Sequence, residues 1–581
     1  MSTINKCTIG RSYIQAYPGK LHICADGWTS PNVVAFIGTT VHCILDGKIV
    51  SAILDFIKAT KAHTGVYLAA RIAECLREYK IQDKIMGFTA DNAANNDTLV
   101  RELSVIVPSF PGKKTRVRCF AHILNLIVKA ILSPFSRKTS IGRSSDSEID
   151  TELDMIEEEM NAGSGMGDEE VELDDDDEIA ADVQMSDNAD VESIDEEADL
   201  DGRLDPLSSQ DINVGRLSIA KLRTLATKIV NSPTIKEDLQ DCCRKVGIPV
   251  GMMVRDVSTR WNSTADLIQR ALELEEALKV LVVKTEFNKP RGVRLARFRL
   301  SAEEWSLLRN LSPLLEVFSL ATKRISQSRI PLLHEVIPIF DKITEALDDF
   351  IDDVERPACV RHAALRELLM LNKYYALTDD SVVYRIAMIL HPRHKMMYFT
   401  KAKWEQSWID TAGRIIREEW TENYKPKDKP VNTAQDGSLT RTSSFARKYF
   451  DSLNDDIAST ADALEEWLAS PVVNTALDPV DYWTQMDRAR NPLARMALDY
   501  LSIPASSTDV ERSFSRGGLT ISKLRHSLSD DSARAACVMG SWASLDDAIP
   551  KDRILASFKA KRQRSKKKAR TDNSSIVIVD D

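Results

Sequence analysis

Short apolar runs with the character of β-strands occupy much of residues 20–135. They cover residues 20–26, 32–44, 47–54 and 84–90. Asp46 and Gly47 join the second run to the third, and this dipeptide is typical of a tight β-hairpin. We therefore expect a hairpin early in the chain and a further strand after it.

Helical spacing separates these runs. Residues 64–79 repeat apolar side chains with the period of a helix, and a short strand at 116–119 leads into a second helical pattern at 121–130. Three strands, a helix, a strand and then more helices form an α/β order. The pattern predicts a mixed sheet flanked by helices.

Between residues 264 and 470 the apolar residues keep the helical period without strand-like alternation. This predicts a large all-α domain inserted into the α/β core. The boundaries that we expect are 1–135 for the first part of the core, 136–212 for an acidic segment, 213–263 for a continuation of the core, 264–470 for the helical insertion, 471–548 for the C-terminal part of the core and 549–581 for a basic tail.

The net charge of -10 conceals two opposite regions. Residues 146–201 hold 26 acidic residues and no Lys or Arg, and we expect the whole segment at 136–212 to be disordered. A solvated loop insertion is the simpler interpretation, and a DNA mimic or a partner-binding tail is the alternative. Elsewhere 77 basic residues outnumber 61 acidic ones, a balance that favours nucleic acid as a partner, with ordinary solvation of a basic protein as the alternative.

The nine cysteines include no Cys-x-x-Cys pair, so neither a disulfide framework nor a cysteine-rich zinc site is indicated. No apolar run approaches the roughly 18 residues of a membrane helix, and the first residues lack the apolar core of a signal peptide. We expect an intracellular protein without a membrane partner.

Three acidic residues stand where a metal site is expected. Asp26 and Asp91 each follow a strand-like run, and strand ends carry the sites of open α/β sheets. Glu511 lies far downstream in a run of small and polar residues. Grouped carboxylates repel one another, and two Mg²⁺ or Mn²⁺ ions would relieve this while activating water for phosphodiester chemistry. For any one acid alone, a helix cap or a surface carboxylate is the simpler interpretation.

The motifs around these acids resemble those of the hAT superfamily of DNA transposases. Asp26-Gly-Trp28 is similar to the family's Asp-x-Trp motif, the residues around Asp91 match its second carboxylate motif, and those around Glu511 match its third. The resemblance covers most of residues 20–545. It implies an RNase H-like core split by a helical insertion, and DNA cleavage and strand transfer by the three acids with two metal ions. Trp28 would then support Asp26.

Two further motifs fit the same family. Cys119-x-x-His122 is similar to its Cys-x-x-His motif, and Arg260-Trp261 resembles the Arg-Trp motif at which the insertion begins. Two ligands are too few for a structural zinc site, so His122 is expected to form a hydrogen bond or to assist catalysis near the acids. Trp261 is either a core residue or, by the resemblance, an indole that stacks on an unpaired base.

The region from Asp478 to Ala548 resembles the family's C-terminal dimerisation region, which implies a homo-oligomer. The last helices of the core are the alternative interpretation of the same pattern. The residues expected to take part in dimerisation are Tyr482, Trp483, Leu493, Leu501 and Phe514.

The tail carries two short motifs. A basic cluster is typical of a nuclear localisation signal or a DNA-contacting arm, with a solubilising tail as the alternative, and it comprises Lys561, Arg562, Arg564, Lys566, Lys567 and Lys568. A β-branched run before two aspartates resembles a SUMO-interacting motif, although such runs also arise by chance, and it comprises Ile576, Val577, Ile578 and Val579. These motifs predict a nuclear protein.

The sequence also departs from the family. No BED zinc-finger pattern precedes Asp26, and His391 stands where family members often have Asp. The leading prediction is a hAT-type transposase or a protein derived from one, which cleaves DNA with metal ions. The alternative is a non-catalytic nuclear protein retained for dimerisation and chromatin association. A general nuclease for RNA:DNA hybrids is a third interpretation, but it leaves Trp261 and the dimerisation region unexplained.

Overall fold

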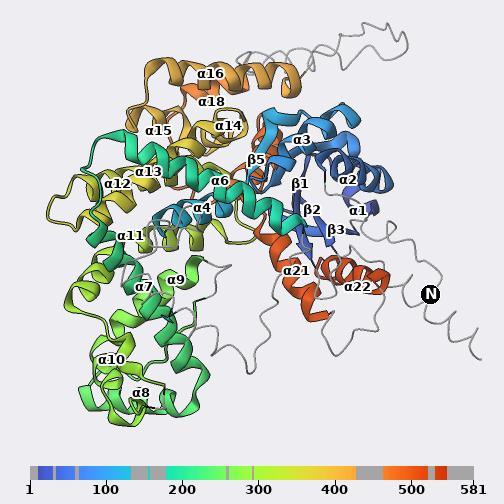
Figure 1. Ribbon diagram of the computed structural model, residues 1–581. Coiled ribbons are helices and arrows are strands. Elements are labelled where there is room, and N and C mark those ends of the chain that lie inside the picture. The colour runs from blue at the N-terminus through green and yellow to red at the C-terminus, as the bar shows by residue number, and fades with distance from the viewer. Residues whose placement is uncertain are drawn as a thin grey trace, which may run out of the picture.

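One five-stranded mixed sheet forms the core in the described part of this computed structural model (Figure 1). Its strands are β1 Leu21–Thr29, β2 Ala35–Leu45, β3 Lys48–Lys58, β4 Ile85–Ala90 and β5 Arg116–Arg118. Their order is β3-β2-β1-β4-β5, with β1 to β3 antiparallel and with β4 parallel to both β1 and β5. This is an RNase H-like arrangement, so the predicted fold class is confirmed.

The structure describes nine stretches of the chain. They are residues 11–29, 35–58, 64–132, 155–156, 178–256, 261–290, 293–426, 462–520 and 530–545.

The hairpin between β2 and β3 follows from two residues. Asp46 and Gly47 have φ values of 49° and 76°, and positive φ at both central positions is what a type I′ turn requires. Leu45 pairs with Lys48 across this two-residue turn. The predicted hairpin is therefore confirmed.

Helices α1 Arg11–Ala16, α2 Gly65–Tyr79, α3 Ala94–Ile106 and α4 Phe120–Leu132 accompany the sheet. In α2 the buried residues Ala69, Ile72, Ala73 and Leu76 repeat with the helical period and face the sheet core. Most of α4 is buried because it lies between the sheet and the helical body. One hydrophobic cluster thus joins α4 to both halves of the molecule.

The predicted all-α insertion is present as a large helical body (Figure 1). Its helices are α6 Glu178–Asp201, α7 Ser209–Asn231, α8 Pro233–Val246, α9 Trp261–Glu273, α10 Glu275–Val282, α11 Ala302–Ile325, α12 Val336–Asp352, α13 Ala358–Thr378, α14 Val383–Leu390, α15 Lys395–Lys401, α16 Gln406–Glu419 and α18 Ala463–Ala469.

Two segment predictions need correction. Residues 178–201 were expected to be disordered, but they form α6, which packs against α4 and α13. Residues 213–263 were expected to continue the core, but α7 and α8 pack against α10 and α11 and so lie with the helical body. Both errors came from treating charge and chain order as guides to packing.

The C-terminal helices return to the sheet. They are α19 Pro479–Arg488, α20 Ala494–Leu501, α21 Thr508–Thr520 and α22 Asp530–Ala543. On the edge strand β3, Asp55 pairs with Arg534 of α22, and Ile53 N donates to Ser541 Oγ at 2.9 Å. These contacts bind a late segment of the chain to an early one.

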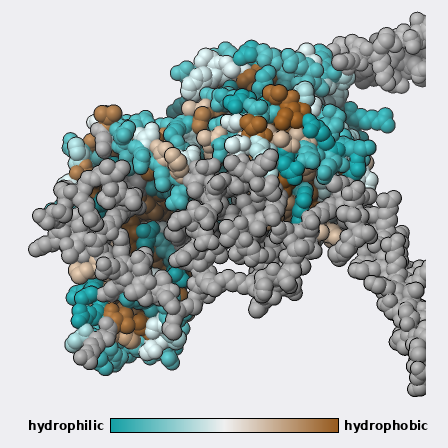
Figure 2. Space-filling view, turned by 45° about the vertical axis from the view of Figure 1, so that its right-hand side comes forward, coloured by the Kyte–Doolittle hydropathy of each residue, from teal (hydrophilic) through white to brown (hydrophobic). Residues whose placement is uncertain are grey.

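Among the helices that the structure describes, none is long and apolar enough to cross a bilayer. Figure 2 shows one face of the molecule, where hydrophilic residues predominate over the described surface and hydrophobic residues gather in separate spots.

Candidate active site

Asp26 and Asp91 lie side by side because β1 and β4 are parallel neighbours. Cys24 pairs with Thr89, so the residues two positions further along, Asp26 and Asp91, come to corresponding places. Asp91 follows β4 directly, as expected, but Asp26 does not end its strand. Pairing with β2 carries β1 on to Thr29, so the prediction that Asp26 ends a strand was wrong.

A chain segment just before α21 brings Glu511 back to these strands. Thr89 Oγ1 donates to the carbonyl oxygen of Pro504 at 2.8 Å, and Phe120 N donates to that of Ala505 at 3.0 Å. Ser507 N and Oγ both lie against Cys119 Sγ, at 3.3 and 3.2 Å. Residues 504–507 are thereby fixed over the ends of β4 and β5.

Gly38 allows α21 to lie directly on the sheet beside Asp26. It is paired with Asp26 across the β1–β2 ladder. A Cβ atom at this position would lie 2.6 Å from the Phe514 ring and 2.7 Å from Val510 Cγ1, closer than real Cβ contacts. The missing side chain therefore lets α21 approach, and Glu511 on this helix comes near Asp26.

A buried hydrogen-bond chain holds the start of the returning segment. Gly87 N donates to His22 Nδ1 at 3.2 Å, so Nε2 carries the proton and donates to Ser502 Oγ at 3.0 Å. Ser502 Oγ then donates to the carbonyl oxygen of Asp499 at 3.1 Å. Burial, and then His42, lowers the pKa of His22 to about 3, so His22 stays neutral and acts as a positioning group.

The charges of Asp91 and Glu511 act on the carboxyl group of Asp26. Burial, and then the nearby charges of Asp91 and Glu511, raises the pKa of Asp26 well above its usual range. Asp26 Oδ1 accepts one hydrogen bond, from Gly27 N at 2.9 Å, which opposes the shift. The structure thus brings together the three acids that the motifs single out.

Asp91 is held in one orientation by residues that the sequence analysis missed. Its Oδ1 accepts from Ala93 N at 2.9 Å and from Asn96 Nδ2 at 2.6 Å. Its carbonyl oxygen accepts from the Arg116 guanidinium at 3.3 Å. The spacing of Asn96, which lies one helical turn into the segment after Asp91, is the signal that identifies it.

Cys119 and His122 have separate tasks. Burial, and then the charge of Glu511, raises the pKa of the Cys119 thiol to about 12, so it holds Ser507 as a neutral group. His122 Nε2 lies 3.1 Å from Asp187 Oδ1 on α6. Burial lowers the pKa of His122, but the hydrogen bond and charge of Asp187, with a smaller effect from Asp91, outweigh this and raise it. The expected hydrogen-bonding role of His122 thus has a partner.

The structure describes only the backbone of Trp28 and Trp261, and it does not describe Arg260. Trp28 lies in β1 opposite Phe36, and Trp261 begins α9. Their side chains and the whole of Arg260 fall outside the described residues. Their proposed contacts with Asp26 and with a base stay predictions.

Four of the five residues expected to take part in dimerisation are buried inside this chain. Trp483, Leu493, Leu501 and Phe514 are all 5% exposed or less. Trp483 Nε1 also donates to the carbonyl oxygen of Leu390 at 2.7 Å, and Phe514 packs on Phe56. These side chains hold the core together, while Tyr482 is only partly buried. Direct partner contacts by the four buried residues are therefore not what this structure shows.

The basic cluster at 561–568 and the SUMO-like run at 576–579 both lie outside the described residues. Both stay predictions.

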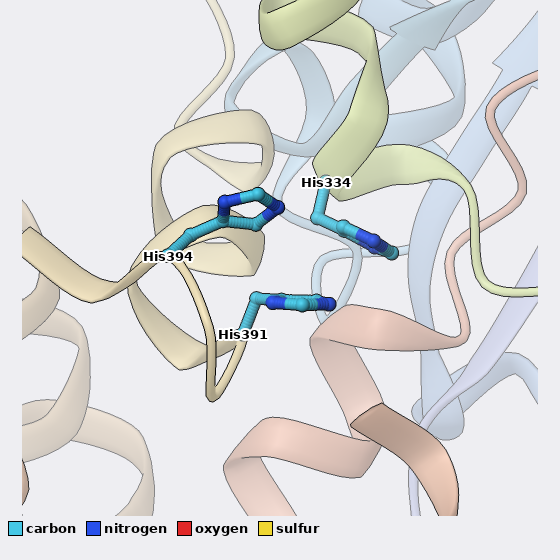
Figure 3. A group of neighbouring side chains, drawn as sticks. All are labelled: His334, His391 and His394. Atoms are coloured by element: carbon cyan, nitrogen blue, oxygen red, sulfur yellow. The ribbon is translucent and has the colours of Figure 1, made fainter. Parts of the chain in front are cut away.

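Three histidines form a separate cluster in the helical body (Figure 3). The rings of His334 and His391 stack with their centroids 4.2 Å apart, and His394 lies beside them. His391 Nδ1 accepts from Arg393 N at 3.2 Å, so its other nitrogen carries a proton in the neutral ring. Rings stacked face to face direct their lone pairs alongside one another rather than to one point, which favours packing over metal binding.

The candidate active site fits a hard divalent cation better. Its donors are carboxylate oxygens, which Mg²⁺ and Mn²⁺ prefer, and their mutual repulsion is what a cation relieves.

Three family models match separate parts of the chain. The ZBED1 RNase-like domain matches residues 24–109, which include Asp26 and Asp91. The ZBED1 RNase-like helical domain matches residues 203–313, and the hAT family C-terminal dimerisation region matches residues 463–543, which include Glu511. The matched parts follow the order of the sheet core, the helical body and the returning helices.

Curated proteins give the same assignment. "Putative transcriptional regulator tpeD" of Talaromyces stipitatus is 25% identical over 85% of this chain and 50% of its own length. "Putative AC transposase" of Zea mays is 20% identical over 89% of this chain and 56% of its own length. Human zinc finger BED domain-containing protein 4 is 23% identical over 53% of this chain and 25% of its own length. The chain spans about half the length of the first two relatives, and it is related to hAT transposases and ZBED proteins through a hAT family dimerisation region and two ZBED1 RNase-like domains.

Proposed function

We propose that this protein cleaves DNA and transfers DNA strands in a metal-dependent reaction, with Asp26, Asp91 and Glu511 as the catalytic and metal-binding residues. The observation that supports this best is the meeting of three acids, from β1, from the residue after β4 and from α21, which together with burial raises the pKa of Asp26. A fold gains nothing in stability from such repulsion, so the cluster points to a cationic ligand.

The reaction would consist of two exchanges at phosphorus. Water attacks a phosphodiester, the bond to one oxygen breaks, and that oxygen leaves as a hydroxyl. The hydroxyl then attacks a phosphorus of another strand and gives up its proton; the bond from that phosphorus to one bridging oxygen breaks, and this oxygen leaves as a new hydroxyl. When bound at these acids, Mg²⁺ or Mn²⁺ supplies an activated water and positive charge at the leaving oxygen.

The chain's own residues supply the positioning. Asn96 and Ala93 N hold the Asp91 carboxylate, and the contacts of Cys119 with Ser507 fix the segment that carries Glu511. His122 lies near enough to Asp91 for that charge to raise its pKa. Rigid placement of the acids favours catalysis because little reorganisation is left to the reaction itself.

Cleavage of labelled duplex DNA in Mg²⁺ or Mn²⁺ tests the proposal. Asp91→Asn and Glu511→Gln keep the shape of each side chain and remove its charge. Each should lower the cleavage rate by more than about a hundredfold, since losing even an outer partner of a metal ligand costs 10- to 100-fold. DNA binding, measured by fluorescence anisotropy, should change little.

A matched control is Asp83→Asn, because Asp83 is exposed on the short helix Gln82–Lys84 away from the three acids. It should cleave at the parental rate. Cleavage that survives Asp91→Asn would contradict the proposed mechanism.

A non-catalytic regulator is the second candidate, because a protein named as a transcriptional regulator aligns with 85% of this chain. In that case the folded protein binds DNA and forms oligomers, but no variant or metal produces cleavage. The two candidates therefore differ in one result, namely cleavage by the parental chain.

We also propose partners and a place of action. The C-terminal dimerisation region supports a homo-oligomer, which would present paired sites to DNA. The basic cluster at 561–568 would direct the protein to the nucleus, and the run at 576–579 would bind SUMO or SUMO-modified proteins. Removing residues 559–570 from a fluorescent fusion should shift it out of the nucleus, while replacing the four residues at 576–579 by alanine should abolish binding to immobilised SUMO.

A further inference from the structure

An acidic helix lies across the junction between the sheet core and the helical body. α6 contains ten acidic residues among its 24 and no Lys or Arg. Its neighbours are α4, α13 and β1, and Figure 1 shows it crossing from the helical body toward the sheet. Like charges along one helix repel and weaken it. The contacts with its neighbours must therefore hold α6 in place.

Asp187 makes the contact nearest to the candidate active site. It is 3% exposed, and its two carboxylate oxygens lie 3.1 Å from His122 Nε2 and 2.6 Å from Lys129 Nζ. Both partners are on α4. Burial raises the pKa of Asp187, but the bonds to His122 and Lys129 outweigh this and lower it.

Asp190 and Asp195 make the same kind of contact with α13. Asp190 lies 2.7 Å from Lys373 Nζ and accepts a hydrogen bond from the Tyr374 hydroxyl. Asp195 lies 2.8 Å from Arg366 Nε. Asp187, Asp190 and Asp195 thus each meet a cation, and Asp190 also meets a hydroxyl donor.

Two small apolar anchors accompany these acids. Ile194 and Ala198 are 1% and 5% exposed and belong to the same hydrophobic cluster as α4 and α13. Their spacing from Asp187 and Asp190 follows the helical period, so one face of α6 carries both kinds of contact. Val191 also packs against this cluster, so apolar and charge contacts together dock the described part of α6.

The residues under α6 are those with which proteins hold a nucleic-acid backbone. Lys, Arg and Tyr are among the side chains that contact phosphates in protein–DNA interfaces, and a protonated His is a cation of the same kind. The basic surface continues beside Tyr374 into a pocket that Arg116 and Arg118 also line. It reaches the candidate active site at His122, whose pKa responds to Asp91.

We propose that the surface of α4 and α13 beneath α6 binds the phosphate backbone of duplex DNA, and that α6 occupies it as an internal competitor. This covered face consists of His122, Lys129, Arg366, Lys373 and Tyr374. The proposal rests on the proposed function, since it takes DNA as the substrate. It adds where the duplex lies and what keeps it away.

The first test removes the charges of α6 that face the body. A variant with Asp187→Asn, Asp190→Asn and Asp195→Asn should bind an arbitrary labelled duplex about tenfold more tightly at low salt. Its affinity should also fall more steeply with salt, because more phosphates are contacted. Unchanged affinity in a parent that does bind DNA would overturn the inference and leave the proposed function standing.

A matched control separates unmasking from net charge. Glu192, Glu196 and Glu197 are exposed on the same helix. Their replacement by Gln removes as many negative charges without touching the covered face. We expect a much smaller gain in affinity, and a gain equal to that of the first variant would show that α6 acts only through its overall charge.

A second variant changes the charge in the opposite direction. Ile194→Asp adds a negative charge to α6 but places it in the apolar contact, where an unpaired carboxylate is costly. α6 should detach, so DNA should bind several-fold more tightly despite the added charge. Weaker binding, as simple repulsion predicts, would count against an internal competitor.

The covered face itself supplies the last test. Lys129→Gln with Lys373→Gln should change the affinity of the parent only slightly, because α6 occupies both lysines. In the variant in which Asn replaces the three aspartates, the two lysine substitutions should abolish most of the tenfold gain in DNA affinity. Equal losses in both backgrounds would place the DNA elsewhere. Duplex RNA serves as a comparison, and a gain confined to RNA would overturn the assignment to DNA.

Discussion

Two groups of carboxylates lie close together in this molecule and differ in what surrounds them. The charges of Asp91 and Glu511 disfavour the ionised form of Asp26 and so help burial to raise its pKa. Asp187, on α6, is paired instead with His122 and Lys129, and its pKa falls. Carboxylates therefore repel one another at the candidate active site, whereas the carboxylate of Asp187 is paired with basic groups.

The difference distinguishes a binding site from a contact within the protein. Where acids repel, a divalent cation adds stability and the site can take part in chemistry. Where acids are already paired, as on α6, a competing anion has to displace them. His122 interacts with both groups of carboxylates, since both Asp187 and Asp91 raise its pKa. Four changes test this comparison, beginning with the largest expected effect.

Divalent metal should stabilise the protein through the repelling acids. At a metal concentration about a hundredfold above Kd, binding adds about 2.7 kcal/mol to the free energy of unfolding. Asp26→Asn should abolish this gain, and thermal unfolding with and without Mn²⁺ measures it. In EDTA the variant should be at least as stable as the parent, because the substitution removes a carboxylate whose pKa is raised in the folded state.

Asp83→Asn is the control, and it should keep the full response to Mn²⁺. Equal stabilisation of Asp26→Asn and the parent would place the metal elsewhere and remove the contrast between the two groups.

The sequence predicted the repelling group far better than the paired one. Asp26, Asp91 and Glu511 lie in local motifs, and the strands that carry the first two follow from apolar runs. The hairpin at Asp46 and Gly47 is equally local. What the sequence did not show is how Glu511 returns, because that depends on contacts between segments hundreds of residues apart.

The prediction of disorder at 178–201 failed for a physical reason. Acidic composition measures the repulsion within a segment but not the cations that another part of the chain brings to it. Lys373 and Arg366 lie on α13, far along the chain from Asp190 and Asp195. The helical spacing of Ile194 and Ala198 was the available signal. The buried dimerisation residues teach the same lesson, since an apolar helix face does not reveal which surface covers it.

Removing the central acid of α6 should loosen that helix. Asp187→Asn leaves His122 and Lys129 without their charged partner, which costs about 1.5–3 kcal/mol for a hydrogen bond to a charged group. Hydrogen exchange of residues 184–200 should then be at least about tenfold faster. Glu197→Gln, on the exposed face of the same helix, should leave exchange unchanged. Unaltered protection in Asp187→Asn would mean that the apolar anchors alone hold α6.

The pH should change the docking of α6 by a smaller amount. The raised pKa of His122 means that its contribution is complete at pH values below the unfolded pKa and is lost as the pH rises through the folded pKa. Asp187, with a lowered pKa, contributes above its unfolded pKa and loses this as the pH falls through its folded pKa. Asp91 and Lys129 also face His122, and they oppose each other.

Protection of α6, corrected for the intrinsic rate of exchange, should therefore be greatest at mildly acidic pH. It should decline toward alkaline pH in the parent and stay flat over that range in His122→Gln. A decline that persists in His122→Gln would assign the pH dependence to another group.

The smallest change removes a single donor from the covered face. Tyr374→Phe keeps the ring and deletes the hydroxyl that donates to Asp190, while Lys373 still pairs with that carboxylate at 2.7 Å. The loss should be about 0.5–1.5 kcal/mol in α6 docking, visible as faster exchange around Asp190. If Tyr374 also contacts the phosphate backbone, then deleting its hydroxyl weakens the binding of both α6 and DNA to the covered face. The affinity for DNA should then change by a smaller factor than the rate of hydrogen exchange around Asp190. A clear gain in affinity would instead show that Tyr374 serves α6 alone, and the covered face would then end at the lysine.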